Sequence, residues 1–400
     1  MQRLWRLRAG VPSEGNINEE IMTKNTKKLA LTGAYAGAEA LKQINPDVMA
    51  VYPITPQTPI IESYAKFCAD GEVETEMIEV ESEHSAMSAC VGSSAAGART
   101  VTASSSQGLA LMNEVLYIAS GLRLPILMLV SARALAAPLN IHGDHSDVMG
   151  CRDSGWIQIF CANSQEVYDK TICAMLLAEK VKLPVMVIMD GFNTSHCVEN
   201  MEILDADAVK NFVGEYNPEQ YLLDIDNPIT VGPVALQNSY FEFRRDLEDA
   251  FENVQGELEK IYDDYEKISG RKYGVVEEYK LENADKVLVV MGSVAGTIKD
   301  AIDELEKSGE KVGLLEVSMF RPFPYETIKN AIHHVSDKAK EVIVLDRNLT
   351  FGTKQVLASE ITHAIKKEVR SVVYGLGGRD TFKKQIIELV EGKNETGFIM

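Results

Sequence analysis

The sequence predicts an α/β fold with two doubly wound parallel-sheet domains joined by a helical connector. Short runs of Val, Ile, Leu and Met recur along the chain, as in strands that are buried on both faces of a parallel sheet. Segments with apolar residues three or four apart separate these runs, which is typical of helices. Residues 200–280 lack such runs and carry a long charged helix instead. We therefore expect an N-terminal extension (1–25), a first α/β domain (26–215), the connector (216–283) and a second α/β domain (284–400).

The first domain begins with a helical pattern over 29–44, followed by a buried strand over 48–52. A helix then opens at Thr58-Pro59, a cap residue followed by a first-turn proline. The remaining expected elements are a small-residue helix after Glu83, strands over 100–104, 124–130 and 183–190, and helices over 109–120 and 167–180. Residues 131–154 are expected to be irregular.

In the connector, apolar residues between Leu247 and Tyr265 form one stripe at helical spacing, so we expect a helix that packs on other structure. The second domain should contain strands over 286–291, 312–317, 341–346 and 370–374. Helices are expected over 297–307, 325–333, 353–367 and 381–391.

Composition excludes several classes of partner. The 400 residues carry a formal charge of −19, which disfavours binding to nucleic acid or to anionic membrane surfaces. No apolar run is long enough to span a bilayer. The six cysteines contain no Cys-x-x-Cys pair, so we expect reduced intracellular thiols and neither zinc nor an iron–sulfur cluster on this chain.

Residues 77–112 are the most unusual stretch of the chain. Glu79, Glu81 and Glu83 precede a run of Ala, Ser, Gly and Cys, and a strand-like segment and a glycine-bearing turn at Gln107-Gly108 close the stretch. A carboxylate at the start of such a helix would lie near the positive end of its dipole, where α/β folds build ligand sites. A tightly packed helix with a solvated acidic cap explains the same pattern equally well.

Two further polar residues follow expected strand ends. Thr55 lies between Ile54 and Pro56 in a proline-rich loop that holds it in an extended path. Arg133 follows the strand that ends at Val130, and a fixed guanidinium is a natural bidentate partner for a carboxylate. From the residues alone, an ordinary turn threonine and a surface arginine remain equally possible.

Other motifs are weaker. Gly292 to Gly296 follows a strand and opens a helix, but its spacing differs from a dinucleotide fingerprint, and a tight turn is the favoured interpretation. The loop from His142 to Asp147 could ligate a metal, although such loops more often form turns, caps or subunit contacts. The sequence contains neither a Gly-x-Ser-x-Gly elbow nor a phosphate-binding P-loop, which disfavours a hydrolase or NTPase of those kinds.

Taken together, several motifs resemble the α subunit of the 2-oxoacid:ferredoxin oxidoreductases, most closely the four-subunit pyruvate type. They are Tyr52-Pro-Ile-Thr-Pro56, Glu81-Ser-Glu83, Ser106-Gln-Gly108, Ala132-Arg133, Gly143-Asp-His-Ser-Asp147, Asp190-Gly191, Phe243-Arg-Arg245, Ser269-Gly-Arg-Lys-Tyr273 and Arg321-Pro-Phe-Pro324. The resemblance runs from about Leu29 to the C-terminus. It implies that the first domain is the pyrimidine-binding domain of a thiamine diphosphate enzyme and that the second resembles the transketolase C-terminal domain.

The resemblance also implies roles for three residues. Glu83 would bond N1′ of the aminopyrimidine and favour its imino tautomer, so that the 4′ nitrogen can remove the thiazolium C2 proton. Glu81 is a rival on charge alone. Thr55 and Arg133 would bind the substrate carboxylate.

Missing motifs point to partners. The Gly-Asp-Gly motif that holds the diphosphate through Mg²⁺ is absent, so the resemblance implies that Mg²⁺ and the diphosphate half of the site lie on a partner. The [4Fe-4S] clusters would likewise lie on β, γ or δ-type subunits. The implied reaction is the reversible, CoA-dependent oxidative decarboxylation of pyruvate to acetyl-CoA and CO₂, reducing ferredoxin in an anaerobic cytoplasm. Alternatives are another 2-oxo acid (2-oxoisovalerate, 2-oxoglutarate or an aryl-glyoxylate), a non-catalytic scaffold or regulatory subunit, and an unrelated transketolase-type enzyme.

Overall fold

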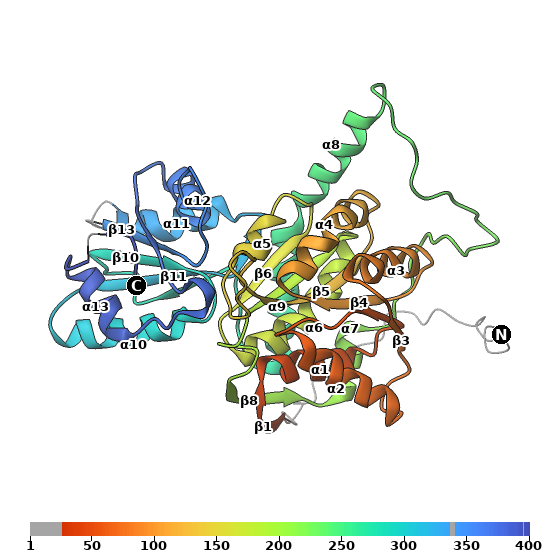
Figure 1. The fold of residues 1–400 in the computed structure, drawn as a ribbon, viewed down its shortest axis with the longest axis horizontal. Coiled ribbons are helices and arrows are strands. Elements are labelled where there is room, and N and C mark those ends of the chain that lie inside the picture. Colours follow the sequence, from red (N-terminus) through yellow and green to blue (C-terminus); the bar gives the residue numbers. More distant parts are fainter. Residues whose placement is uncertain (1–25, 337–340, 395) are drawn as a thin grey trace.

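A computed structural model of the chain describes residues 26–336, 341–394 and 396–400, which form two α/β units side by side (Figure 1). The expected extension over 1–25 lies outside the described residues. The two main sheets have seven and five strands, and a two-stranded sheet flanks the first unit.

The first sheet has the order β12-β6-β7-β5-β4-β2-β3. Neighbouring strands from β6 to β3 run parallel, and β12 is antiparallel at the edge. The strands are β2 (Val48–Val51), β3 (Glu76–Glu79), β4 (Thr100–Ser104), β5 (Ile126–Ala132), β6 (Ile157–Cys161), β7 (Val185–Asp190) and β12 (Met319–Arg321). The predicted doubly wound parallel sheet is confirmed, although β3, β6 and β12 were not predicted as strands. All three are short, and β6 carries Gln158 within it.

Helices cover both faces of this sheet (Figure 1). On one face lie α3 (Glu83–Ala95) and α4 (Ser106–Gly121), and on the other α1 (Gly33–Ile44) and α6 (Ser164–Val181). The remaining helices of this unit are α2 (Thr58–Ala69), α5 (Ser146–Gly150) and α7 (Ala206–Val213). The expected irregular stretch therefore contains one short helix, α5.

The helix expected over 29–44 is wrong in its first turn. Residues Thr26–Thr32 form strand β1, which pairs antiparallel with β8 (Val198–Leu204), and the helix begins at Gly33. Thr32 caps this helix by accepting a hydrogen bond from the Tyr35 N–H. The small apolar residues of this segment suit either structure, and its pairing partner lies far along the chain. Residues 200–280, where no buried strand was expected, contain most of β8 and the edge strand β9 (Val276–Tyr279), both of which are partly exposed.

The connector contains two helices where one was expected. α8 (Tyr240–Phe251) and α9 (Val254–Ser269) are separated at Glu252 and Asn253. α9 buries its apolar stripe against the first unit, whereas α8 buries only Leu247 and projects outward (Figure 1). The stripe therefore predicted burial correctly for α9 but could not reveal the break.

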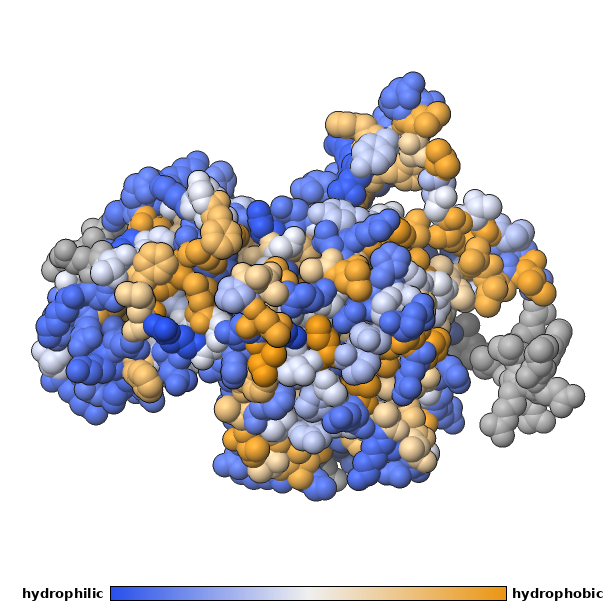
Figure 2. Space-filling view, viewed as in Figure 1, coloured by the Kyte–Doolittle hydropathy of each residue, from blue (hydrophilic) through white to orange (hydrophobic). Residues whose placement is uncertain are grey.

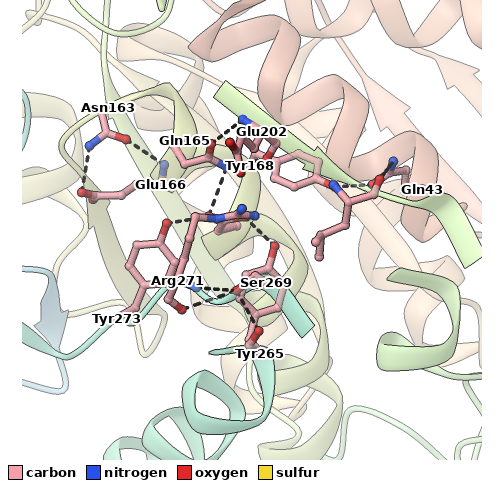
Figure 3. Close-up of polar contacts among 12 residues, drawn as sticks. Gln43, Asn163, Gln165, Glu166, Tyr168, Glu202, Tyr265, Ser269, Arg271 and Tyr273 are labelled. Atoms are coloured by element: carbon pink, nitrogen blue, oxygen red, sulfur yellow. Dashed lines mark hydrogen bonds and ion pairs between the residues drawn. The ribbon is translucent and has the colours of Figure 1, made fainter. Parts of the chain in front are cut away.

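A buried carboxylate fastens α9 and the following segment to α6. Asp169 accepts hydrogen bonds from the hydroxyls of Tyr265 and Tyr273, each at 2.5 Å, and from Arg271 Nε at 2.6 Å and Nη2 at 2.7 Å. Figure 3 shows these two tyrosines and Arg271 converging. Four charge-assisted bonds satisfy a carboxylate that has no exposed surface, so this network holds the connector in place.

The second sheet has the order β14-β13-β10-β11-β9, with only β9 antiparallel. Its strands are β9 (Val276–Tyr279), β10 (Lys286–Val290), β11 (Val312–Val317), β13 (Glu341–Asp346) and β14 (Arg370–Val373). Its helices are α10 (Val294–Lys307), α11 (Tyr325–Ser336), α12 (Val356–Ile365) and α13 (Lys383–Val390), with a short 3₁₀ turn at Leu376–Gly378. The four strands and four helices predicted for this unit are all present. In the described ranges, no helix is long and apolar enough to cross a membrane.

Candidate functional site

The polar residues singled out in the sequence gather at one edge of the first sheet. Parallel strands end at the same edge, so the residues that follow β2, β3 and β5 come together there. Thr55 follows β2, Glu83 follows β3 and Arg133 follows β5. Asp190 is the last residue of β7 at this edge.

Glu83 is the first residue of α3. Ser82 caps this helix, because its side chain accepts a hydrogen bond from the Ser85 N–H at 3.2 Å. The Glu83 residue is only 7% exposed, and among the described residues its carboxylate has no hydrogen-bond partner. Its oxygen atoms are not among the fully buried, unpaired polar atoms of the described residues, so the carboxylate can accept a hydrogen bond from a ligand that enters the site.

A glycine lets the Glu83 side chain pack closely against α4. A β-carbon at Gly108 would lie 2.6 Å from Glu83 Oε1 and 2.7 Å from Ser104 Oγ. The Ser104 hydroxyl is buried and also lacks a partner in the described part of the chain. Glycine at position 108 therefore lets the Glu83 carboxylate and the Ser104 hydroxyl pack against the start of α4. The turn expected at Gln107-Gly108 is wrong, since these residues belong to the first turn of α4.

The rival carboxylate differs in its environment. Glu81 is exposed and accepts a hydrogen bond from the Ser85 hydroxyl at 2.8 Å. This bond lowers the pKa of Glu81, so its charge is already satisfied in the folded chain. The sequence gives both residues the same charge, and only their burial in the fold separates them.

Arg133 and Thr55 lie in contact. Arg133 is 6% exposed, and its Nη1 donates to the Thr55 carbonyl oxygen at 2.8 Å while its Nε donates to the Asn140 carbonyl at 3.0 Å. Nη2 has no protein acceptor in the described ranges. Burial lowers the pKa of Arg133, and the nearby Asp147 opposes this shift. The guanidinium is therefore held rigidly, with one nitrogen free for an anion and the exposed Thr55 beside it.

Asp147 joins the loops that surround this site. Its carboxylate accepts hydrogen bonds from the N–H groups of Ser106 at 2.7 Å, Arg133 at 2.9 Å and Val148 at 2.8 Å. Burial raises the pKa of Asp147 to about 7, while the backbone N–H donors lower it. The residue thus ties the start of α4 to the end of β5. The sequence offered no role for it.

The loop from His142 to Asp147 connects the two units. His145 Nε2 lies 2.6 Å from Asp190 Oδ1, and Asp144 accepts a hydrogen bond from the Gly377 N–H at 3.1 Å. Asp190 also pairs with Arg347 at 2.7 Å. His145 and Asp144 are thus used in contacts that hold the two units together. This supports a structural role for the loop and not a metal site.

Asp190 also explains the glycine motif at the start of α10. Its Oδ2 accepts from the Ser293 N–H at 2.8 Å, so the N-terminus of α10 binds an internal carboxylate. Burial alone would raise the pKa of Asp190, but Arg347 and His145 together lower it well below its usual range. The tight turn predicted at Gly292 is present, with φ of +77°.

Two family profiles match the chain. Residues 39–263 match "Pyruvate flavodoxin/ferredoxin oxidoreductase, thiamine diP-bdg", and residues 284–386 match "Pyruvate:ferredoxin oxidoreductase core domain II". Pyruvate synthase subunit PorA of Thermotoga maritima is 50% identical over 377 residues, covering 92% of this chain and 95% of the relative. The PorA of Methanocaldococcus jannaschii is also 50% identical, covering 88% and 90%.

Ketoisovalerate oxidoreductase subunit VorA of Pyrococcus horikoshii is 40% identical over 376 residues, covering 92% of this chain and 94% of the relative. Among solved structures, the chain resembles a 2-oxoglutarate:ferredoxin oxidoreductase from Magnetococcus marinus with a TM-score of 0.67 and 20% identity. That match covers 92% of this chain and 65% of the solved chain. At this identity the likeness concerns the fold, which is transketolase-like.

Proposed function

Because the chain belongs to the pyruvate:ferredoxin oxidoreductase family, we propose that it is the subunit that holds the pyrimidine end of thiamine diphosphate and the substrate carboxylate. The reaction would be the CoA-dependent oxidative decarboxylation of pyruvate to acetyl-CoA and CO₂ with reduction of ferredoxin, or its reverse. The unpartnered, buried carboxylate of Glu83 is the observation that carries this proposal.

Glu83 fits the cofactor. Its carboxylate stands at the start of α3, packed beside Gly108, and has no hydrogen-bond partner among the described residues. The neighbouring Ser104 hydroxyl also lacks a partner in this part of the chain. In this proposal Glu83 shares a proton with a ring nitrogen of the aminopyrimidine and so holds the ring in its reactive tautomer. Thiamine diphosphate, when bound, supplies the nucleophilic carbon and the electron sink for decarboxylation. The first α/β domain, residues 26–215, would thus be the pyrimidine-binding domain, and residues 284–400 would form the transketolase C-terminal-like domain.

Arg133 and Thr55 would orient the 2-oxo acid. Nη2 of Arg133 is the donor left free after Thr55 and Asn140 engage the other guanidinium nitrogens, and the Thr55 side chain stands exposed beside it. A substrate carboxylate bound there would be held by a charge-assisted hydrogen bond from a fixed donor. Fixing the carboxylate fixes the position of the adjacent 2-oxo carbon, which lowers the entropic part of the barrier.

Other parts of the enzyme would lie on partner chains. We assign Mg²⁺ and the diphosphate half of the site to a β-type subunit, because this sequence has no Gly-Asp-Gly motif. The [4Fe-4S] clusters would lie on partner subunits of the β, γ or δ type and pass electrons to ferredoxin. The chain would act in the cytoplasm and would be inactive alone.

A branched 2-oxo acid is the second candidate substrate. The VorA relatives of Pyrococcus horikoshii and Pyrococcus abyssi are 40% and 41% identical to this chain, close to the values for several PorA relatives. Arg133 and Thr55 would bind the carboxylate of any 2-oxo acid, so this pair does not select between them. The shape of the pocket that receives the side chain of the 2-oxo acid would select between the substrates.

The test uses the complex purified with its native partners. We would compare wild type with Glu83→Gln and with the matched control Glu81→Gln, whose carboxylate is exposed and hydrogen-bonded to Ser85. The assay is CoA-dependent reduction of a low-potential dye, with pyruvate, 2-oxoisovalerate and 2-oxoglutarate in parallel.

We expect pyruvate to be preferred, Glu83→Gln to lose at least about 100-fold in rate, and Glu81→Gln to stay within about threefold. Preference for another 2-oxo acid with Glu83→Gln inactive would correct the substrate only. An active Glu83→Gln complex would refute the role of this residue and favour a scaffold or regulatory subunit.

A further inference from the structure

A long arm stands away from the first unit. We define the arm as residues 221–243, which run without helix or strand as far as Ser239 and then enter the first turn of α8 (Figure 1). At its start the Leu222 N–H donates to the Ala95 carbonyl at the end of α3, at 2.7 Å. At its other end α8 returns to the body and contacts α4. The arm therefore leaves from α3 and returns beside α4.

The arm is apolar and exposed. Its six most exposed large apolar residues show 59–91% of their surface to solvent. They are Leu223, Ile225, Val234, Leu236, Tyr240 and Phe241. Figure 2 shows hydrophobic residues gathered along this segment. Exposed apolar residues gathered on one segment mark interaction sites on folded proteins.

The body between the two ends of the arm is also suited to contact. On α4, Leu111, Tyr117 and Ile118 are exposed apolar residues. On α3, a β-carbon at Gly92 would meet no atom within 4 Å, so this helix presents open space to an approaching backbone. The arm and α4 thus both expose apolar residues, whereas the exposed residues of α3, Ser88 and Gly92, are small.

The outer faces of α3 and α4 are continuous with the cofactor site, because Glu83 is the first residue of α3 and Gly108 lies in the first turn of α4. A chain that covered both helices would reach the edge where the unpartnered carboxylate of Glu83 lies. We infer that the arm and the outer faces of α3 and α4 bind one occupant, the partner subunit that completes the thiamine diphosphate site. This inference rests on the proposed function for the identity of the partner.

Charge defines the chemistry of the partner and disfavours a second copy. The arm carries Asp224, Asp226 and Glu242 and no lysine or arginine. The whole chain has a formal charge of −19, so two copies would bring like charges together. The partner surface should be an apolar groove with lysine or arginine side chains at its rim.

The experiment measures association of the full chain with the separately purified partner subunit that binds the diphosphate, in the presence of Mg²⁺ and thiamine diphosphate. Sedimentation equilibrium gives Kd for wild type and for the triple variant Ile225→Asp/Val234→Asp/Phe241→Asp. The matched control is Phe351→Asp/Phe382→Asp, which changes exposed aromatic residues of the second unit. Thermal unfolding of each free chain checks that the variants fold, and we expect unchanged midpoints because all five side chains are exposed.

We expect the arm variant to raise Kd at least 100-fold and the control to stay within threefold of wild type. Gly92→Leu should likewise weaken association without destabilising the free chain, and Asp226→Lys/Glu242→Lys should weaken it about tenfold at low salt. An arm variant that binds as tightly as wild type would overturn the inference. So would a wild-type chain that does not bind the partner, or one that dimerises alone through the arm. If the complex assembles through the arm but oxidises no 2-oxo acid, the proposed function fails and the arm remains the docking element.

Discussion

Replacing Gly108 with alanine tests whether the position of the Glu83 carboxylate matters for catalysis. The new β-carbon would lie 2.6 Å from Glu83 Oε1, whereas ordinary contact begins near 3.4 Å, so the carboxylate must move by about 0.8 Å. Misplacing a reacting group by ~1 Å costs about 100-fold in rate. We therefore expect kcat of the assembled enzyme to fall by about 30–100-fold, or about 2–3 kcal/mol in the barrier.

The free energy of unfolding should fall by about 1–3 kcal/mol, because the new β-carbon would also lie 2.7 Å from the buried Ser104 Oγ and 2.9 Å from Glu83 Cγ. The helix preference of alanine, up to about 1 kcal/mol, offsets this only in part. The matched control is Gly121→Ala at the other end of α4, where a β-carbon would meet no atom within 4 Å. The assays are CoA-dependent dye reduction with pyruvate and thermal unfolding of the free chain. If Gly108→Ala and Gly121→Ala both keep activity within threefold of wild type, the position of the Glu83 carboxylate has no role in catalysis.

Three further changes address the substrate, the contact between the units and pH. Arg133→Lys keeps the charge but loses the guanidinium fork, so KM for the 2-oxo acid should rise about 10–50-fold with a smaller loss of kcat; a KM within twofold of wild type would remove Arg133 from the substrate site. Asp190→Asn leaves the buried Arg347 without its counter-ion, so it should cost about 3–5 kcal/mol of unfolding free energy, and a melting temperature equal to that of the exposed control Asp226→Asn would contradict this. Burial and neighbouring carboxylates raise the pKa of Glu316 on β11 to about 7. Between about pH 4.5 and 7 the Glu316 carboxyl therefore keeps its proton in the folded chain but has lost it in the unfolded chain. Stability should therefore fall as pH rises through this window, and Glu316→Gln should flatten the dependence of the melting temperature between pH 5 and 8; parallel curves for the two chains would refute this.

The arrangement of the site shows how much an α/β fold achieves by topology alone. Thr55, Glu83 and Arg133 are separated by up to 78 positions, yet each follows a strand of one parallel sheet. The sequence could predict this gathering, because buried strands are recognisable and parallel strands end at one edge. Three contacts could not be predicted, because each joins segments whose distance depends on loop geometry. They are the hydrogen bond from Arg133 to the Thr55 carbonyl, the hydrogen bonds of Asp147, and the contact of the 142–147 loop with Gly377.

Several errors in the secondary structure predicted from the sequence share one cause. Each missed feature depends on which distant segment packs against it. These features are the strand over 26–32, the strand β6 and the break between α8 and α9. Small apolar residues suit a strand or a helix, and their tertiary partner decides between the two. Four strands of the second unit were predicted because they are apolar runs that need no such partner to be recognised, whereas its edge strand β9 was not predicted.

By itself, the sequence determined the α/β class, the sequence positions of most buried strands and helices, and the presence of an acid, a threonine and an arginine after strand ends. These depend on local composition and on the periodicity of apolar residues, which act over a few turns of chain. Only the tertiary structure decided which carboxylate is buried without a partner, which glycine makes room beside it, and which apolar residues remain exposed on the arm. Burial and close approach are relations between segments far apart in the chain, so no local pattern determines them.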